Sequence, residues 1–68
     1  MLGWRNAKKK KPNNFVRLEI KTSDGKYHIG YWTGHEFLET EGHNVIKSCV
    51  SWRYLAKREY MRYYKVGE

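Results

Sequence analysis

The dipeptide Asp24-Gly25 constrains the fold of this chain more than any other feature of the sequence. Both central residues of a type I′ turn need positive φ, and Asp and Gly tolerate that conformation. The preceding segment 16–22 alternates apolar with charged residues, which is the period of a β-strand with one buried face. Turn chemistry and hydrophobic period therefore predict the same element, an antiparallel hairpin with a two-residue loop.

The two-residue loop also predicts a register for this hairpin. Ile20 would face Ile29 and Leu18 would face Tyr31 on the core side of the sheet. Arg17 would then lie opposite Trp32 on the other side, where a cation–π contact is expected.

The second turn, at 33–35, leaves two pairings open. A loop of residues 33–34 pairs Ile29 with Leu38, whereas a loop of residues 34–35 pairs Trp32 with Phe37. Both loops place Leu38 on the expected core face and Phe37 on the other face. A three-residue loop would reverse the two sides of this strand.

The C-terminal half of the chain predicts a fourth strand followed by a helix. Residues 45–54 alternate so that Val50 and Trp52 point inward. The run 53–65 has good helix formers and no turn residue, and its rings fall on one side at helical spacing. A fifth strand over 60–64 is the alternative. The expected fold is α+β: a four-stranded antiparallel meander, a C-terminal amphipathic helix and a disordered basic N-terminal arm.

Positive charge is concentrated at the two ends of this chain of 68 residues. The formal net charge is +7, of which residues 1–12 carry +5, residues 13–52 carry −1 and residues 53–68 carry +3. We therefore expect a basic flexible arm at 1–13 and one small domain at 14–66. Because a polyanion is the natural partner of such ends, we expect contact with nucleic acid.

The residue types that support catalysis or metal binding do not form a motif. The three histidines and Cys49 lack the spacing of a zinc site, and the glycines belong to turns and strands rather than to a phosphate loop. No nucleophile elbow or Cys-His motif is present. We expect no metal, no cofactor and no enzymatic activity. A single cysteine and the lack of a long apolar run indicate a reducing compartment, the cytoplasm.

Rings and cations on the outer face of the sheet, together with the basic ends, form the predicted binding site. Trp32 and Phe37 would stack bases, and the cations would contact phosphates. The residues predicted to contact nucleic acid or a partner are Arg5, Lys8, Lys9, Lys10, Lys11, Arg17, Trp32, Phe37, Arg58, Arg62 and Lys65. The alternative for Trp32 and Phe37 is a second small core.

Residues 23–55 resemble a group of small uncharacterised phage and prophage proteins. The shared pattern consists of Asp24-Gly25, Gly30-Tyr31-Trp32, Gly34, Phe37, and Val50 with Trp52. The resemblance implies a phage-derived accessory protein in the cytoplasm of a bacterial host. It also implies a second possible function, a protein-binding inhibitor of a host defence complex of the anti-CRISPR type, whose partner would be a nucleic-acid-binding complex. The Tyr- and Arg-rich helix would carry that contact.

Overall fold

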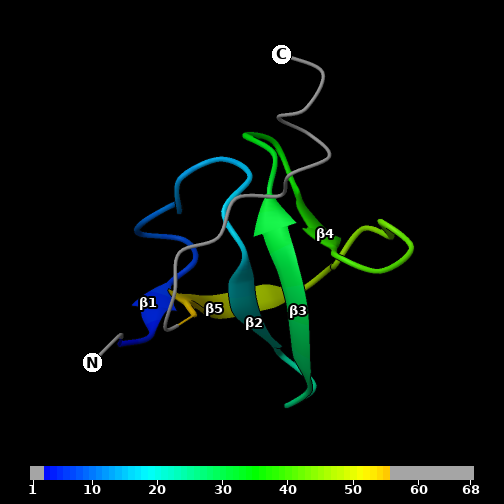
Figure 1. The fold of residues 1–68 in the computed structure, drawn as a ribbon. Coiled ribbons are helices and arrows are strands. Elements are labelled where there is room, and N and C mark those ends of the chain that lie inside the picture. Colours follow the sequence, from blue (N-terminus) through cyan, green and yellow to red (C-terminus); the bar gives the residue numbers. More distant parts are fainter. Residues whose placement is uncertain (1–2, 56–68) are drawn as a thin grey trace.

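The computed structural model describes residues 3–55, and this part of the chain is all-β. One antiparallel sheet contains all five of its strands (Figure 1). The strands are β1 (Arg5–Asn6), β2 (Leu18–Thr22), β3 (Tyr27–Trp32), β4 (Phe37–Glu39) and β5 (Cys49–Tyr54). The expected α+β class is therefore wrong.

The strand order is β1-β5-β2-β3-β4, so the sheet is not the meander that was predicted. Strands β2, β3 and β4 follow one another as hairpins, but β5 returns to lie beside β2, which is the Greek-key order. This return places β2, whose side chains at positions 18, 20 and 22 are all buried, in the interior of the sheet, with both edges hydrogen-bonded. In a meander, β2 would be an exposed edge.

The first hairpin closes with a three-residue turn instead of the predicted two-residue loop. The backbone N–H of Thr22 donates to the carbonyl of Lys26 at 3.0 Å, and Gly25 donates to the carbonyl of Thr22 at 2.9 Å. Within this turn, only Gly25 takes the left-handed conformation, with φ of 84°. This geometry matches the hairpin in which a turn is followed by a glycine bulge. Ile20 therefore lies opposite His28, not Ile29.

A shift of one residue moves the side chains of β3 to the other face of the sheet. Leu18 and Ile20 are fully buried, whereas Tyr27 and Ile29 project from the opposite face with exposed fractions of 56% and 39%. Tyr31 is buried all the same, because its ring packs on Phe15 at a centroid distance of 6.0 Å.

The second hairpin confirms one of the two predicted pairings and corrects the orientation of its strand. Trp32 pairs with Phe37 and Tyr31 with Leu38, which corresponds to the loop of residues 34–35. Phe37 belongs to the core, at 6% exposure, and Leu38 is half-buried on the other face. The predicted orientation of β4 was wrong for the same reason as that of β3, because the face of β4 was deduced from the face assigned to β3.

Residues 3–13 are not a disordered arm. Arg5 and Asn6 pair with β5, and Ala7 is buried at the edge of the core. The indole Nε1 of Trp52 donates to the carbonyl of Lys10 at 2.8 Å, which holds the basic turn against the sheet. Figure 1 shows this N-terminal segment beside β5. The physical reason is that a buried indole needs an acceptor for its N–H.

The core lies on one face of the sheet, and its centre is Trp52. Val50, which was predicted to point inward, is 43% exposed. Arg53 and Tyr54, placed at the start of the predicted helix, belong to β5. The rest of that prediction, at 56–65, lies outside the described residues. The buried cluster consists of Ala7, Leu18, Ile20, Phe37, Ile46 and Trp52.

Candidate nucleic-acid interface

The sheet face opposite the core presents large side chains to solvent. Tyr27 and Ile29 project from β3, and Trp4, just before β1, lies close enough to extend the same surface. Trp4 is 39% exposed, and its ring centroid is 5.8 Å from that of Tyr27, with the ring planes inclined by 51°. These three side chains form an apolar surface on which flat groups can stack.

Two cations lie over the rings of this surface. The guanidinium carbon of Arg53 is 4.7 Å from the Trp4 ring centroid, and the Lys21 ammonium is 5.8 Å from the Tyr27 ring centroid. Both distances fall within the range of cation–π attraction. We call the set Trp4, Lys21, Tyr27, Ile29 and Arg53 the open face.

A glutamate fixes the position of Arg53. Glu19 lies directly across from Arg53 in the β2–β5 pair, and its Oε1 accepts bonds from Nε at 2.8 Å and Nη2 at 2.7 Å. The pair is partly solvent-exposed, so its contribution to stability is small, but it orients the guanidinium plane over Trp4. Lys21 is half-buried and has no ion pair within residues 3–55.

The structure distributes the predicted contact residues over different surfaces. Arg5 and the lysines of the 8–10 turn are exposed near β1. Lys11 places its ammonium 5.1 Å from the Trp32 ring centroid. Trp32 is half-buried against Phe37, with centroids 4.7 Å apart, so these two rings form part of the core and not the predicted stacking surface. Arg58, Arg62 and Lys65 lie outside the described residues.

Among the predicted contact residues that the structure describes, only Arg17 borders a groove that continues the open face. This groove also includes Tyr27 and Ile29 among its walls. Tyr27 and Ile29 were not predicted to be exposed because β3 was assigned to the wrong face, and Trp4 and Arg53 were assigned to a flexible arm and a helix. The sequence signal for the observed register was the position of Gly25 after Ser23-Asp24. A glycine at the third position of a three-residue loop takes the left-handed conformation, as Gly25 does here.

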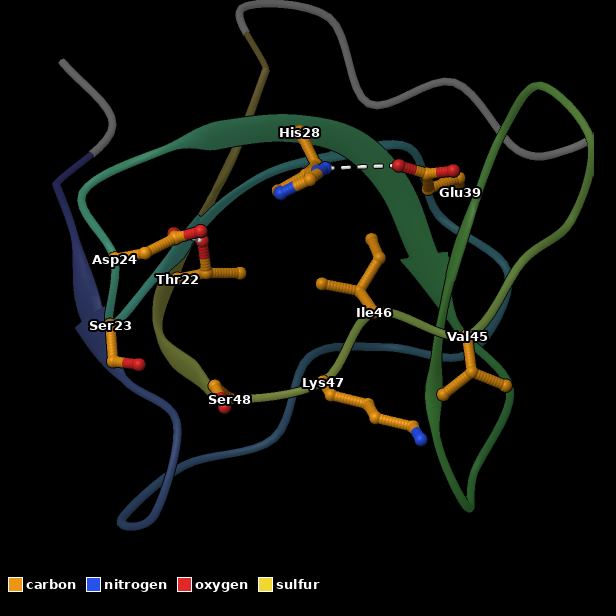
Figure 2. A pocket seen from close by; sticks show the side chains of 9 residues that line it. All are labelled: Thr22, Ser23, Asp24, His28, Glu39, Val45, Ile46, Lys47 and Ser48. Atoms are coloured by element: carbon orange, nitrogen blue, oxygen red, sulfur yellow. Dashed lines mark hydrogen bonds and ion pairs between the residues drawn. The ribbon is translucent and has the colours of Figure 1, made fainter.

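A second hollow, of about 300 Å³, lies on the core side of the sheet between the first turn and residues 45–48. Figure 2 shows His28 and Glu39 meeting at its rim, where Nδ1 of the imidazole and Oε2 of the carboxylate are 3.0 Å apart. A carboxylate that orients an imidazole is one component of a general base. Within the described residues no hydroxyl side chain hydrogen-bonds to His28, so a catalytic triad is absent from this part of the chain.

Among residues 3–55, Cys49 is the one cysteine, and its thiol is half-buried. Burial raises the pKa of the Cys49 thiol, and the nearby positive charge of Lys11 opposes that shift. A protonated thiol is a poor nucleophile. Among the described residues no group of three or more His, Cys, Asp or Glu side chains is placed to hold a metal ion.

Comparison with known proteins identified no relative of this chain. No protein family matches the chain, and no curated protein or solved structure matches it. Among the described residues no helix is long and apolar enough to span a membrane. In the part of the chain that the structure describes, the fold and the open face define the class: an all-β sheet with an exposed aromatic and cationic surface.

Proposed function

We propose that this protein binds single-stranded nucleic acid, without catalysing a reaction, through the open face. The observation that carries the proposal is the pair of exposed rings, Trp4 and Tyr27, each with a cation over it. Proteins that bind single strands combine stacking rings with positive charge along the backbone path. We place this function in the cytoplasm of a bacterial cell.

The charge of the chain complements a polyanion. The net charge is +7, and exposed lysines follow Ala7 in the turn next to β1. A strand stacked on Trp4 would pass close to this turn, because Trp4 immediately precedes β1. In this proposal Lys8, Lys9 and Lys10 contact phosphates, while Lys21 and Arg53 flank the bases.

Fluorescence anisotropy with a labelled mixed-sequence oligonucleotide tests this function. Trp4→Ala and Tyr27→Ala should each weaken binding by about 1 to 3 kcal/mol, the range for one stacked base. Val50→Ala is the matched control, because Val50 is exposed at 43% but does not belong to the open face. Duplex DNA should bind more weakly than the single strand, since its bases are not available for stacking.

Salt dependence gives a second readout of the same proposal. Lys9→Gln should reduce the slope of log affinity against log salt by about 0.7, the value for one phosphate contact on a single strand, because Lys9 is one of the exposed lysines proposed to contact phosphates. Equal affinity of wild type, Trp4→Ala and Tyr27→Ala for the single strand would refute the proposal.

The second function, inhibition of a host protein complex, remains a proposal with a different test. The start of its predicted contact helix belongs to β5 and residues 56–65 lie outside the described residues. Trp, Tyr and Arg on the open face are also residue types that dominate protein interfaces. Partners should be captured from a bacterial lysate with and without nuclease treatment. A protein partner that survives nuclease treatment and is lost in Trp4→Ala would favour inhibition, and loss of every partner on nuclease treatment would favour nucleic-acid binding.

A further inference from the structure

The groove next to Tyr27 is large enough to receive one nucleotide of a bound strand. Its volume is about 650 Å³, and Tyr27 belongs both to this groove and to the open face. A strand stacked on Trp4 and Tyr27 therefore has a neighbouring space for its next base. This inference rests on the proposed function.

The walls of the groove differ in chemistry. Ile29, 39% exposed, supplies an apolar wall, and the Tyr27 ring supplies an aromatic one. Glu41, just beyond β4, contributes an exposed carboxylate. Glu41 has no ion pair or side-chain hydrogen bond within residues 3–55, in contrast to Glu39, whose Oε2 is engaged by His28. Figure 2 shows that engaged pair.

A carboxylate in the path of a polyanion repels phosphates, so Glu41 is unfavourable unless it meets hydrogen-bond donors of a base. Among the four bases, guanine alone offers two adjacent N–H donors on one edge, at N1 and at the 2-amino group. Adenine and cytosine offer one amino group beside an acceptor, and thymine offers one N–H between two acceptors. A carboxylate that accepts two parallel bonds therefore favours guanine.

We infer that the groove is a base-selective subsite in which Glu41 accepts hydrogen bonds from the Watson–Crick edge of guanine while Tyr27 packs against its ring. The open face then supplies affinity for any single strand, and the groove supplies preference for one base. Arg17 also borders this groove.

The test uses oligothymidylates of about eight nucleotides, within the usual site size. One central position carries thymidine, deoxyguanosine, deoxyinosine, deoxyadenosine or deoxycytidine. Affinity is measured by fluorescence anisotropy. Deoxyguanosine should bind about tenfold more tightly than thymidine, and deoxyinosine, which lacks the 2-amino group, should lose most of this gain. Glu41→Gln should remove the difference between deoxyguanosine and deoxyinosine without weakening the all-thymidine oligomer.

Glu36→Gln is the matched control, because Glu36 is an exposed glutamate in the second turn that does not border the groove. Equal affinity for all five oligomers, with Trp4→Ala weakening each of them, would overturn the subsite and leave the proposed function standing. A deoxyguanosine preference that persists in Glu41→Gln would also overturn it. Lack of binding to every oligomer would overturn both proposals.

Discussion

The indole of Trp52 donates its Nε1–H to the carbonyl oxygen of Lys10, 2.8 Å away, and joins residues separated by 42 positions in the chain. Trp52 is 1% exposed at the centre of the core, and Lys10 belongs to the basic turn after β1. Through this bond the largest of the fully buried side chains holds the lysine-rich turn that follows β1. The lysines of this turn are therefore presented at a defined place on the molecule.

Trp52→Phe tests this tether, because Phe fills most of the space but cannot donate the hydrogen bond. We expect the free energy of unfolding to fall by about 1 to 3 kcal/mol, the range for leaving a partly buried acceptor without its partner. Trypsin should also cleave after Lys8, Lys9 or Lys10 faster than in wild type. Trp4→Phe, at an exposed site, should change stability by less than about 0.5 kcal/mol. Unchanged proteolysis in Trp52→Phe would show that the indole bond does not hold the turn.

Gly25→Ala tests the turn that sets the register of the first hairpin. Gly25 has φ of 84°, and a Cβ there would meet no atom within 4 Å, so any loss of stability comes from backbone strain. We expect a loss of about 1 to 2 kcal/mol in urea denaturation. Gly25→Asn should lose less, because Asn tolerates this conformation. Gly3→Ala is the control, since Gly3 also has open space but lacks a positive φ. Equal stability of Gly25→Ala and wild type would argue against the three-residue turn.

Gly30→Ala tests the close contact between β3 and β4. An added Cβ would lie 2.1 Å from the carbonyl oxygen of Leu38 and 3.1 Å from Cδ1 of Ile46, so the two strands would have to separate. We expect a loss of about 3 kcal/mol, at the upper end for overpacking. Amide hydrogen exchange gives a local readout, because the Ile46 N–H bonded to the Phe37 carbonyl at 2.8 Å should exchange faster. A fully stable Gly30→Ala would contradict this packing.

Asp24→Asn tests a pH-dependent part of the stability. A hydrogen bond from the Thr22 hydroxyl, and then one from the Lys26 backbone N–H at 3.1 Å, lowers the pKa of Asp24 below its usual 3.8. A lowered folded-state pKa stabilises the fold above the unfolded-state pKa, and this stabilisation is lost as the pH falls through the folded-state value. Wild type should therefore lose more thermal stability between pH 6 and pH 2 than Asp24→Asn. Parallel melting curves for the two proteins over this range would contradict the assignment.

Local patterns were sufficient to locate most strands and the second loop. The alternation of Val16, Leu18 and Ile20 identified a strand with one buried face, and those three side chains are fully buried. The pairing of Trp32 with Phe37 was one of the two weighed from turn length. The exposure of Tyr27 and Ile29 was not predicted, because both were assigned to the core.

That error shows how far turn chemistry constrains a hairpin. An Asp-Gly pair fits both a two-residue loop and the last two positions of a three-residue loop, and the two differ by one residue in register. With period-2 side chains, one residue decides which face of β3 is exposed. The apolar residues of β3 did not resolve the choice, because Tyr27, Ile29 and Tyr31 look like core residues in a sequence.

By itself the sequence determined that the segment 16–54 contains antiparallel strands and approximately where they lie, because alternation and turn residues act over a few positions. The tertiary structure alone decided that β5 returns to β2, that the N-terminal segment adds β1, and that Trp4 meets Tyr27. Those outcomes depend on which contacts bury Trp52 and satisfy its N–H, and such contacts join residues about forty positions apart that share no local pattern.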